Sequence, residues 1–332
     1  MKISVDAMGG DFAPENVIGG VKMALAEYSG IERLLLTGDE TRVKAELDRQ
    51  GVPTRKIEIV HTTEIVEMCE SPAKAVRRKK DSSISRAVDL VKEGLADAIV
   101  SAGNTGAAVT AATLKLRTLP GVERAGIASP IPNEYGTCNI VDAGANIGAK
   151  AVHLLQYGIM GAVYAKHVLG SKNPTVGLMS VGTEEAKGTD FTREVFALLK
   201  ASNLNFIGNV EGHDLFETKL DVVVCDGFVG NVVLKSCEAT AKAMFKWLKD
   251  EIVASPIRKM GAMLAKSAFK AVKARGSYES YGGSPLLGTN GICIIAHGSS
   301  SALAMKNAIR VAAEAVDHRV NPHIIEEIQA NK

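Results

Sequence analysis

Short runs of β-branched and apolar residues alternate along the chain with amphipathic stretches, and this alternation constrains the fold more than any other feature. The runs are four to six residues long, as strands are, and most stretches between them are long enough for a crossover helix. The predicted strands cover residues 3–6, 34–37, 57–60, 98–101, 137–142, 176–181, 221–225 and 292–296. The clearest predicted helices cover residues 14–29, 82–94 and 105–117. This βαβ order predicts an α/β fold with a mostly parallel sheet and helices on both faces.

Nothing in the sequence divides the chain into separate domains. Of its 332 residues, 46% are hydrophobic and 23% are charged, a balance that excludes a disordered chain. No Pro/Ser-rich linker, low-complexity tract or internal repeat interrupts the pattern. We therefore expect residues 1–332 to form a single compact α/β domain.

Charge and cysteine content exclude several classes of protein. The 39 Lys and Arg residues against 37 Asp and Glu leave a formal charge of +2, too little for a chain that coats nucleic acid. The five cysteines are widely spaced without a CxxC pair, which favours neither disulfides nor a zinc site and suits a reducing cytoplasm. Asp6 and Asp11 come too early for a signal peptide, and no stretch is apolar enough to span a bilayer.

Several common metal and nucleotide signatures are missing from the sequence. There is no HxxxH or HExxH pair, no GxxxxGK[ST] phosphate loop and no GxGxxG fingerprint. These absences disfavour a metalloprotease, a P-loop NTPase and an ordinary nicotinamide dehydrogenase. We expect neither a metal ion nor an organic cofactor.

Polar, glycine-rich turns follow four of the predicted strands. They read DAMGGDFAP, SAGNTGA, DAGANIGA and CDGFVGN in chain order. Ligands bind at the carboxyl ends of strands in open parallel sheets, where glycine lets backbone amides approach and helix N-termini favour anions. We therefore expect several of these turns to converge on one cleft. For any single turn, the alternative is that glycine only tightens the connection.

Seven ordered blocks between Ser4 and Ser301 resemble the bacterial phosphate acyltransferase (PlsX) family. The blocks are VDAMGGDFAP, KKDSSISRAVDLVKEGLADAIVSAGNTGA, VDAGAN, VGTEEAKG, NVEGHD, DVVVCDGFVGNVVLK and GGSPLLGTNGICIIAHGSSS. The resemblance implies a Rossmann-like αβα sandwich related to the phosphotransacetylases and to the isocitrate/isopropylmalate dehydrogenases. That kinship accounts for a doubly wound chain without a GxGxxG fingerprint.

The resemblance also implies an activity and partners. The implied reaction moves a fatty acyl group from acyl-acyl carrier protein to inorganic phosphate, giving acyl phosphate for the first acylation step of bacterial phospholipid synthesis. It further implies a homodimer in the cytoplasm, associated peripherally with the inner face of the cell membrane, where a downstream membrane acyltransferase consumes the product.

Phosphate attack on a thioester needs positioned donors more than a serine or cysteine nucleophile, because phosphate is already charged. We select Lys187, Asp226, Asn231 and His297 as candidate catalytic residues, since each lies in a block with such donors. For Asp226 the alternative is a helix N-cap, and for His297 a structural histidine.

Further residues of the glycine-rich turns and helix starts are candidates for binding phosphate or substrate. They are Asp6, Gly9, Gly10, Asp11, Asn104, Thr105, Gly106, Asn146, Thr189, Gly227, Gly230 and Lys235. For Asp6 and Asp11, stabilisation of their own turn is an equally good explanation. Cys225 follows three valines on a predicted strand, so we expect a buried, inert thiol and direct attack by phosphate, without an acyl-cysteine.

Two basic regions indicate macromolecular contacts. Arg77, Arg78 and Lys79 belong to a cluster suited to docking an acidic carrier protein, the alternative being a solvated helix face. Residues 241–275 carry nine Lys and Arg against two acidic residues, and Pro256 is expected to divide this basic amphipathic segment into two helices. In the second, apolar residues recur at helical spacing, which predicts membrane contact or, alternatively, packing in a core or dimer. The candidate membrane residues are Met260, Leu264 and Phe269.

Three other functions are compared with the acyltransferase. Phosphotransacetylase runs the same chemistry on acetyl-coenzyme A and differs in acyl length and carrier. An isocitrate dehydrogenase-like oxidoreductase needs a clustered Arg and Asp set for metal and carboxylates, which the sequence lacks. A noncatalytic membrane-surface scaffold uses the basic segment alone and leaves the seven blocks unexplained.

Overall fold

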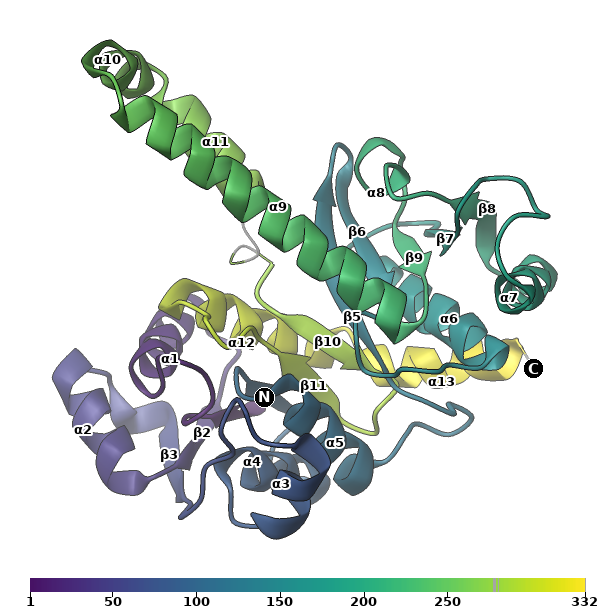
Figure 1. The fold of residues 1–332 in the computed structure, drawn as a ribbon. Helices are drawn as coiled ribbons and strands as arrows, with labels where there is room; N and C mark the ends of the chain where they lie inside the picture. Colours follow the sequence, from purple (N-terminus) through teal and green to yellow (C-terminus); the bar gives the residue numbers. More distant parts are fainter. Residues whose placement is uncertain (277–278, 280, 332) are drawn as a thin grey trace.

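Eleven strands form one continuous sheet in the computed structural model, which describes residues 1–276, 279 and 281–331 (Figure 1). The strands are β1 (Lys2–Asp6), β2 (Arg33–Gly38), β3 (Ile57–His61), β4 (Ala98–Ser101), β5 (Gly126–Asn133), β6 (Gly136–Val141), β7 (Thr175–Met179), β8 (Asn205–Val210), β9 (Val222–Val224), β10 (Ser284–Leu287) and β11 (Ile292–Ile295). Their order across the sheet is β3-β2-β1-β4-β11-β10-β5-β6-β9-β7-β8. All the predicted strands are confirmed within one or two residues at their ends.

The helices lie between the strands as the βαβ pattern predicts. They are α1 (Glu15–Glu27), α2 (Glu40–Gln50), α3 (Pro72–Arg78), α4 (Ser83–Lys92), α5 (Thr105–Leu116), α6 (Ala151–His167), α7 (Asp190–Ala201), α8 (Asp214–Glu217), α9 (Gly227–Val253), α10 (Pro256–Leu264), α11 (Lys266–Gly276), α12 (Ala302–Asp317) and α13 (Val320–Ala330). A single 3₁₀ turn, η1 (Thr54–Lys56), precedes β3.

Helices cover both faces of the sheet. On one face α1, α2 and α12 share a buried core, which continues through α12 to the core under α6, α7 and α13. On the other face α3, α4 and α5 pack together, and Leu234 of α9 joins their core while Val229 and Val233 of α9 pack beside α8. The predicted αβα arrangement is therefore confirmed, and α9 lies over both halves of its face.

The sheet is not parallel throughout, because β10 runs antiparallel to both β11 and β5, and β5 runs antiparallel to β6. As a result β6, β9, β7 and β8 point opposite to β1, β4 and β11. The glycine-rich turns, several of which were expected to converge on one cleft, therefore fall into two pairs. The turns after β1 and β4 lie at one edge, whereas those after β6 and β9 lie at the other.

The sequence analysis missed β5, β8 and β10. β5 contains Pro130 and Pro132, and β10 contains Pro285. Proline argues against a strand because it has no backbone N–H to donate to a neighbouring strand. Each of the three antiparallel pairings contains at least one of these missed strands, since β10 pairs with β11 and β5, and β5 pairs with β6. Because these strands were missed, the reversal of strand direction between the two halves of the sheet was not predicted.

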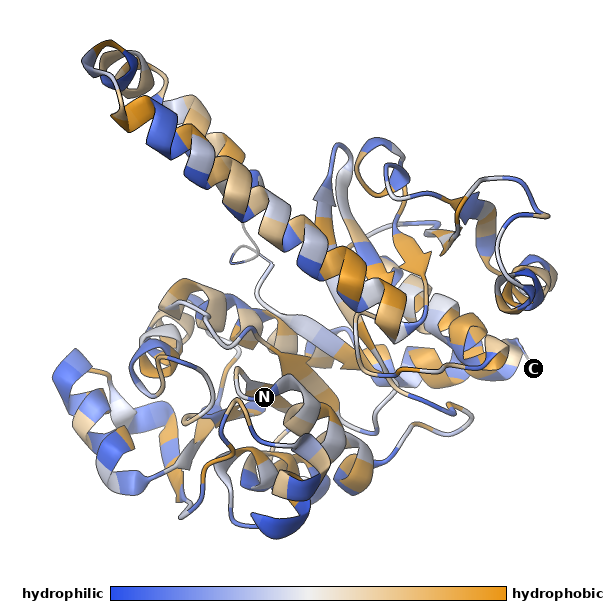
Figure 2. Ribbon diagram, in the orientation of Figure 1, coloured by the Kyte–Doolittle hydropathy of each residue, from blue (hydrophilic) through white to orange (hydrophobic). Residues whose placement is uncertain are grey.

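The segment from α9 to α11 projects from the body as a helical hairpin (Figure 1). The predicted break at Pro256 is confirmed, since α9 ends at Val253 and α10 starts at Pro256. The single helix expected after Pro256 is wrong, because Ala265 separates α10 from α11. Figure 2 shows hydrophilic and hydrophobic residues interleaved along this hairpin. Across the described part of the chain, no helix combines the length and apolarity needed to cross a membrane.

Candidate active site

The turns after β1, β4 and β11 form one cluster, which we call the His297 cluster: Asp6, Gly10, Asp11, Asn104 and His297. Asp6 is 1% exposed, and its carboxylate accepts hydrogen bonds from Ser101 Oγ at 2.8 Å and from the backbone amide of Met8 at 3.2 Å. Burial raises the pKa of Asp6, opposed by its hydrogen bonds from serines and backbone amides. Asp6 therefore ties the β1 turn to the end of β4, which favours its predicted turn-stabilising role over phosphate contact.

Glycine is required where the β1 turn meets its neighbours. A Cβ on Gly9 would lie 2.7 Å from the backbone nitrogen of Gly103, and one on Gly10 would lie 3.0 Å from the carbonyl oxygen of Gly298. The backbone amide of Asp11 donates to the same Gly298 carbonyl at 2.8 Å. The β1 turn is thus held directly against the turn that carries His297.

His297 lies just after β11, in the turn before α12. Its Nδ1 accepts a hydrogen bond from the backbone amide of Ser299 at 3.2 Å and lies 2.8 Å from the Ser299 hydroxyl. Because a backbone amide can only donate, the neutral ring carries its proton on Nε2. Burial lowers the pKa of His297, and Lys235 and Lys242 of α9 lower it further. The ring is therefore a neutral Nε2–H donor at neutral pH.

Asn104 is the N-cap of α5, and its side chain is committed to the fold. Its Oδ1 accepts from the amide of Ala107 at 3.0 Å, while its Nδ2 donates to the carbonyls of Met68 and Glu70 at 3.0 and 3.1 Å. Gly106 packs against Pro72 at the start of α3. These contacts leave the exposed Thr105 as the residue of this turn best placed for a ligand.

At the opposite edge, the turns after β6 and β9 form a second group, the Asp142 cluster: Asp142, Asn146, Asp226 and Asn231. The Asp142 side chain is fully buried and accepts from the amides of Ile127, Gly144, Ala145 and Asn146 at 2.7–3.0 Å. The sequence analysis did not select Asp142. Its signal was an acidic residue directly after a buried β-branched strand, the same position that Asp6 holds after β1.

Asn146 joins the Asp142 turn to its surroundings. Its Nδ2 donates to the Ala125 carbonyl at 2.5 Å and to the Tyr157 hydroxyl at 2.9 Å. Its own carbonyl accepts from the amide of Gly227 at 3.0 Å. The side chain predicted to bind phosphate is thus engaged in holding the turn and the start of α9.

The first turn of α9 docks on the Asp142 cluster. Asp226 is the N-cap of α9, accepting from the amides of Phe228 and Val229 at 2.8 and 3.1 Å, which is the alternative considered for it. A Cβ on Gly230 would overlap the Asp142 carbonyl oxygen, so only glycine allows this approach. The Asn231 side chain lies directly over Gly144, and the residue is exposed.

The two clusters are linked by α9 rather than by a shared sheet edge. From Asn231, the helix continues to Lys235, whose Nζ pairs with Glu238 at 2.9 Å. Lys235 and Glu238 are close enough to His297 to act on its charge. Lys235 is therefore near enough to His297 to interact with it electrostatically, and Asn231 lies one turn before Lys235 on α9.

Lys187 and Thr189 lie in the turn after β7, the strand beside β9. Thr189 is the N-cap of α7, accepting from the amide of Thr192 at 3.2 Å, and the amide of Lys187 donates to Glu184 at 3.0 Å. Among the described residues, the contacts of Lys187 stay within its own turn. The strand order places it at the same edge as the Asp142 cluster, so its catalytic role remains a prediction.

Cys225 is 4% exposed and its Sγ faces the Asp142 carbonyl. Burial raises the pKa of this thiol well above its usual range, and the carboxylates of Asp142 and Asp226 raise it further. The expected buried, inert thiol is confirmed, because a protonated sulfur without access to substrate is a poor nucleophile.

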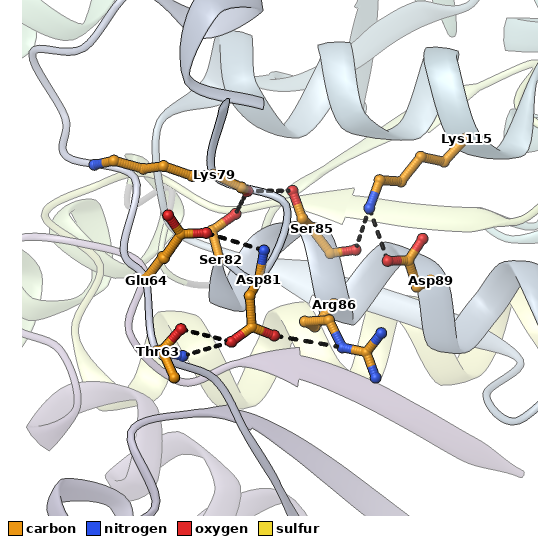
Figure 3. A network of polar contacts seen from close by, with 9 residues as sticks. All are labelled: Thr63, Glu64, Lys79, Asp81, Ser82, Ser85, Arg86, Asp89 and Lys115. Carbon is orange, nitrogen blue, oxygen red and sulfur yellow. Dashed lines mark hydrogen bonds and ion pairs between the residues drawn. The ribbon is translucent and has the colours of Figure 1, made fainter. Parts of the chain in front are cut away.

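The predicted carrier-docking residues differ in accessibility. Arg77 and Arg78 are exposed on α3, but Lys79 forms an ion pair with Glu70 and donates to the Ile65 carbonyl at 2.6 Å. The Lys79 carbonyl also accepts from Ser82 and Ser85, within the network shown in Figure 3. Lys79 therefore fastens the loop before α4, and its role in docking a carrier protein stays a prediction.

Comparisons with known proteins agree with this geometry. A family model described as fatty acid synthesis protein matches residues 1–323. Phosphate acyltransferase from Akkermansia muciniphila is 55% identical over 334 residues, covering 99% of this chain and 96% of its own. Phosphate acyltransferase from Pelotomaculum thermopropionicum is 50% identical over 330 residues, covering 99% and 96%.

Solved structures share the fold. A phosphotransacetylase from Streptococcus pyogenes matches with a TM-score of 0.64 and 18% identity, covering 96% of this chain and 94% of its own. A branched-chain phosphotransacylase from Enterococcus faecalis V583 matches with a TM-score of 0.54 and 17% identity, covering 95% and 99%. The expected kinship with the phosphotransacetylase fold is thus confirmed.

Proposed function

The chain belongs to the phosphate acyltransferase (PlsX) family, and on that premise we propose that residues 1–332 act as one catalytic unit that transfers a fatty acyl group to inorganic phosphate. The observation that supports this site most directly is the course of α9. It carries Asn231 and Lys235 from the Asp142 cluster toward His297. In this proposal the amide, the ammonium group and the imidazole N–H supply the donors that an anionic nucleophile and a developing oxyanion require.

The reaction needs positioning more than activation. An oxygen of hydrogen phosphate attacks the thioester carbonyl carbon and forms a C–O bond; the C–S bond then breaks, and the proton lost by the phosphate passes through water to the leaving thiolate. The Nε2–H of His297 and the Asn231 amide stabilise the oxyanion, while Lys235 offsets the phosphate charge. The inert thiol of Cys225 supports this direct route over an acyl-enzyme.

Single-turnover conversion tests the proposed reaction. Long-chain acyl-acyl carrier protein and radiolabelled phosphate should give labelled acyl phosphate and free carrier protein, with acetyl-coenzyme A tested in parallel. The phosphotransacetylase fold favours acetyl transfer as the second candidate, and it predicts rapid acetyl phosphate formation instead. No product from either donor would overturn both.

The acyl donor in this proposal is an acidic carrier protein that docks on Arg77 and Arg78, both exposed on α3. Reversing both charges, Arg77→Glu with Arg78→Glu, should raise KM for acyl-acyl carrier protein about tenfold, because rim charges steer association. Breakdown of acyl phosphate should be nearly unchanged, and Arg42→Glu with Arg55→Glu, at exposed sites on α2 and η1, is the matched control. Equal effects on both reactions would reject the docking surface.

The projecting hairpin is the proposed contact with an anionic membrane surface. Leu264 is 89% exposed, Met260 is 61% exposed and Phe269 is 36% exposed. Replacing Leu264 and Phe269 by glutamate should lower the fraction that floats with anionic liposomes at least fivefold, since apolar insertion and charge attraction act together.

A matched variant, Met23→Glu with Leu114→Glu, alters exposed apolar residues on the body and should float like the parent protein. If the hairpin variant still binds liposomes fully, the hairpin is not the membrane contact and is assigned to the proposed homodimer interface. Sedimentation of both variants at several concentrations separates the two roles, because only the loss of a dimer interface lowers the sedimenting mass.

A further inference from the structure

Beside the Asp142 cluster, large apolar side chains are exposed where the fold has no need of them. Phe228 and Val232, one turn apart on α9, are 61% and 50% exposed, and Ile147 in the turn after β6 is 81% exposed. The hydrogen bond from the Gly227 amide to the Asn146 carbonyl joins the two backbone segments that carry Phe228 and Ile147 as their next residues. Two elements from neighbouring strands thus present one apolar surface to solvent, which marks a binding surface.

This surface is continuous with the polar groups of the proposed site. Phe228, Asn231, Val232 and Lys235 are spaced three and four residues apart, so they form one stripe along α9, which we call the Phe228 stripe. All four residues are exposed. The stripe starts with apolar side chains beside Ile147 and ends with an ammonium group about 10 Å further along the helix.

The stripe thus has an apolar end at Phe228 and a charged end at Lys235, with Asn231 beside Val232 in its middle, and the substrate of the proposed reaction likewise has an apolar end and a polar end. We propose that the acyl chain of the donor lies on Phe228, Val232 and Ile147, with its thioester carbonyl at Asn231 and His297 and the phosphate toward Lys235. This inference rests on the proposed function and adds the orientation of the acyl group to it. A second copy of the chain on the same apolar surface is the competing occupant.

Apolar contact with the acyl chain predicts that KM depends on the length of that acyl chain. Replacing Phe228 and Ile147 by serine should raise KM for palmitoyl-acyl carrier protein at least tenfold, because each apolar contact with the chain adds to binding. KM for butyryl-acyl carrier protein should change less than twofold, since a four-carbon chain does not reach past the carbonyl site to both side chains. Leu114→Ser, on α5 and 54% exposed, is the matched control and should change neither value.

Each result decides between occupants. A selective loss for the long chain supports the proposal, and Val232→Asn alone should reproduce it in part. Equal effects on both donors, or none, overturn it; equal effects with a lower mass in sedimentation assign the surface to a second copy. Failure of the unmodified protein to form acyl phosphate from either donor refutes the proposed function itself, so the two failures are distinct.

Discussion

Replacing Gly230 by alanine is expected to lower kcat about 100-fold and to destabilise the fold by about 3 kcal/mol. The added Cβ would overlap the carbonyl oxygen of Asp142 and would also lie 3.0 Å from Cys225 Sγ. Both neighbours are buried and the oxygen belongs to the backbone, so α9 itself must move away. A shift of about 1 Å displaces Asn231 and Lys235 together, which is enough to misalign a site that acts by positioning.

Single-turnover rates and thermal unfolding measure the two effects, with an expected fall in Tm of roughly 4 °C for a chain of this length. Gly261→Ala is the matched control, because Gly261 is also helical but a Cβ there would meet nothing within 4 Å. That variant should keep its rate and be as stable or slightly more stable. Parent-like activity and stability in Gly230→Ala would show that α9 is not closely docked on the Asp142 turn.

Replacing His297 by alanine is expected to lower kcat about 100-fold at neutral pH, because it removes a donor to the oxyanion. The same ring should titrate below its ordinary value of about 6.5, since burial and the positive charge of Lys235 both disfavour protonation. Below that pKa, a proton on Nδ1 opposes the Ser299 amide, and the turn loses its hydrogen bond. Activity should therefore fall as pH drops through this pKa.

The change in the pKa of His297 that follows the loss of the Lys235 charge tests whether these two residues lie close together. Lys235→Gln removes a repulsive charge, so the pKa of His297 should rise toward its ordinary value. NMR titration of the imidazole measures the pKa directly, which is necessary because phosphate also titrates near neutral pH. His213→Ala, at a site with 58% side-chain exposure, is the control for rate. An unchanged pKa in Lys235→Gln would contradict the proximity of α9 to the His297 turn.

Local features of the fold were predictable from sequence because they depend on neighbours along the chain. The buried strands, the break at Pro256 and the burial of Cys225 follow from hydrophobic patterning and proline geometry. The direction of strands does not, because it depends on pairing between distant segments. Pro130 and Pro285 hid the strands that reverse the sheet, so the division of the glycine-rich turns between its two edges was not predicted.

The candidate site was predictable in composition but not in the roles of its residues. Asp226, Asn104 and Asn146 stand where ligand donors were expected, yet their side chains hold helix starts and turns. A sequence gives the residue type at the end of a strand. The same side-chain amide or carboxylate can form hydrogen bonds with the backbone or with a ligand equally well. Only the surrounding contacts distinguish the two, as the buried Asp6 and Asp142 illustrate.

The length of α9 determines how far the tip of the hairpin lies from the Asp142 cluster. Its 27 residues form one helix from the Asp142 cluster to the base of the apolar tip, a rise of about 40 Å. If that tip anchored the enzyme with α9 perpendicular to the bilayer, the product would be released far from the lipid headgroups. It would then have to diffuse through water to reach the membrane. If the tip is the membrane contact, α9 acts as a spacer in that orientation, and a protein lying flat on the bilayer would release its acyl phosphate next to the headgroups.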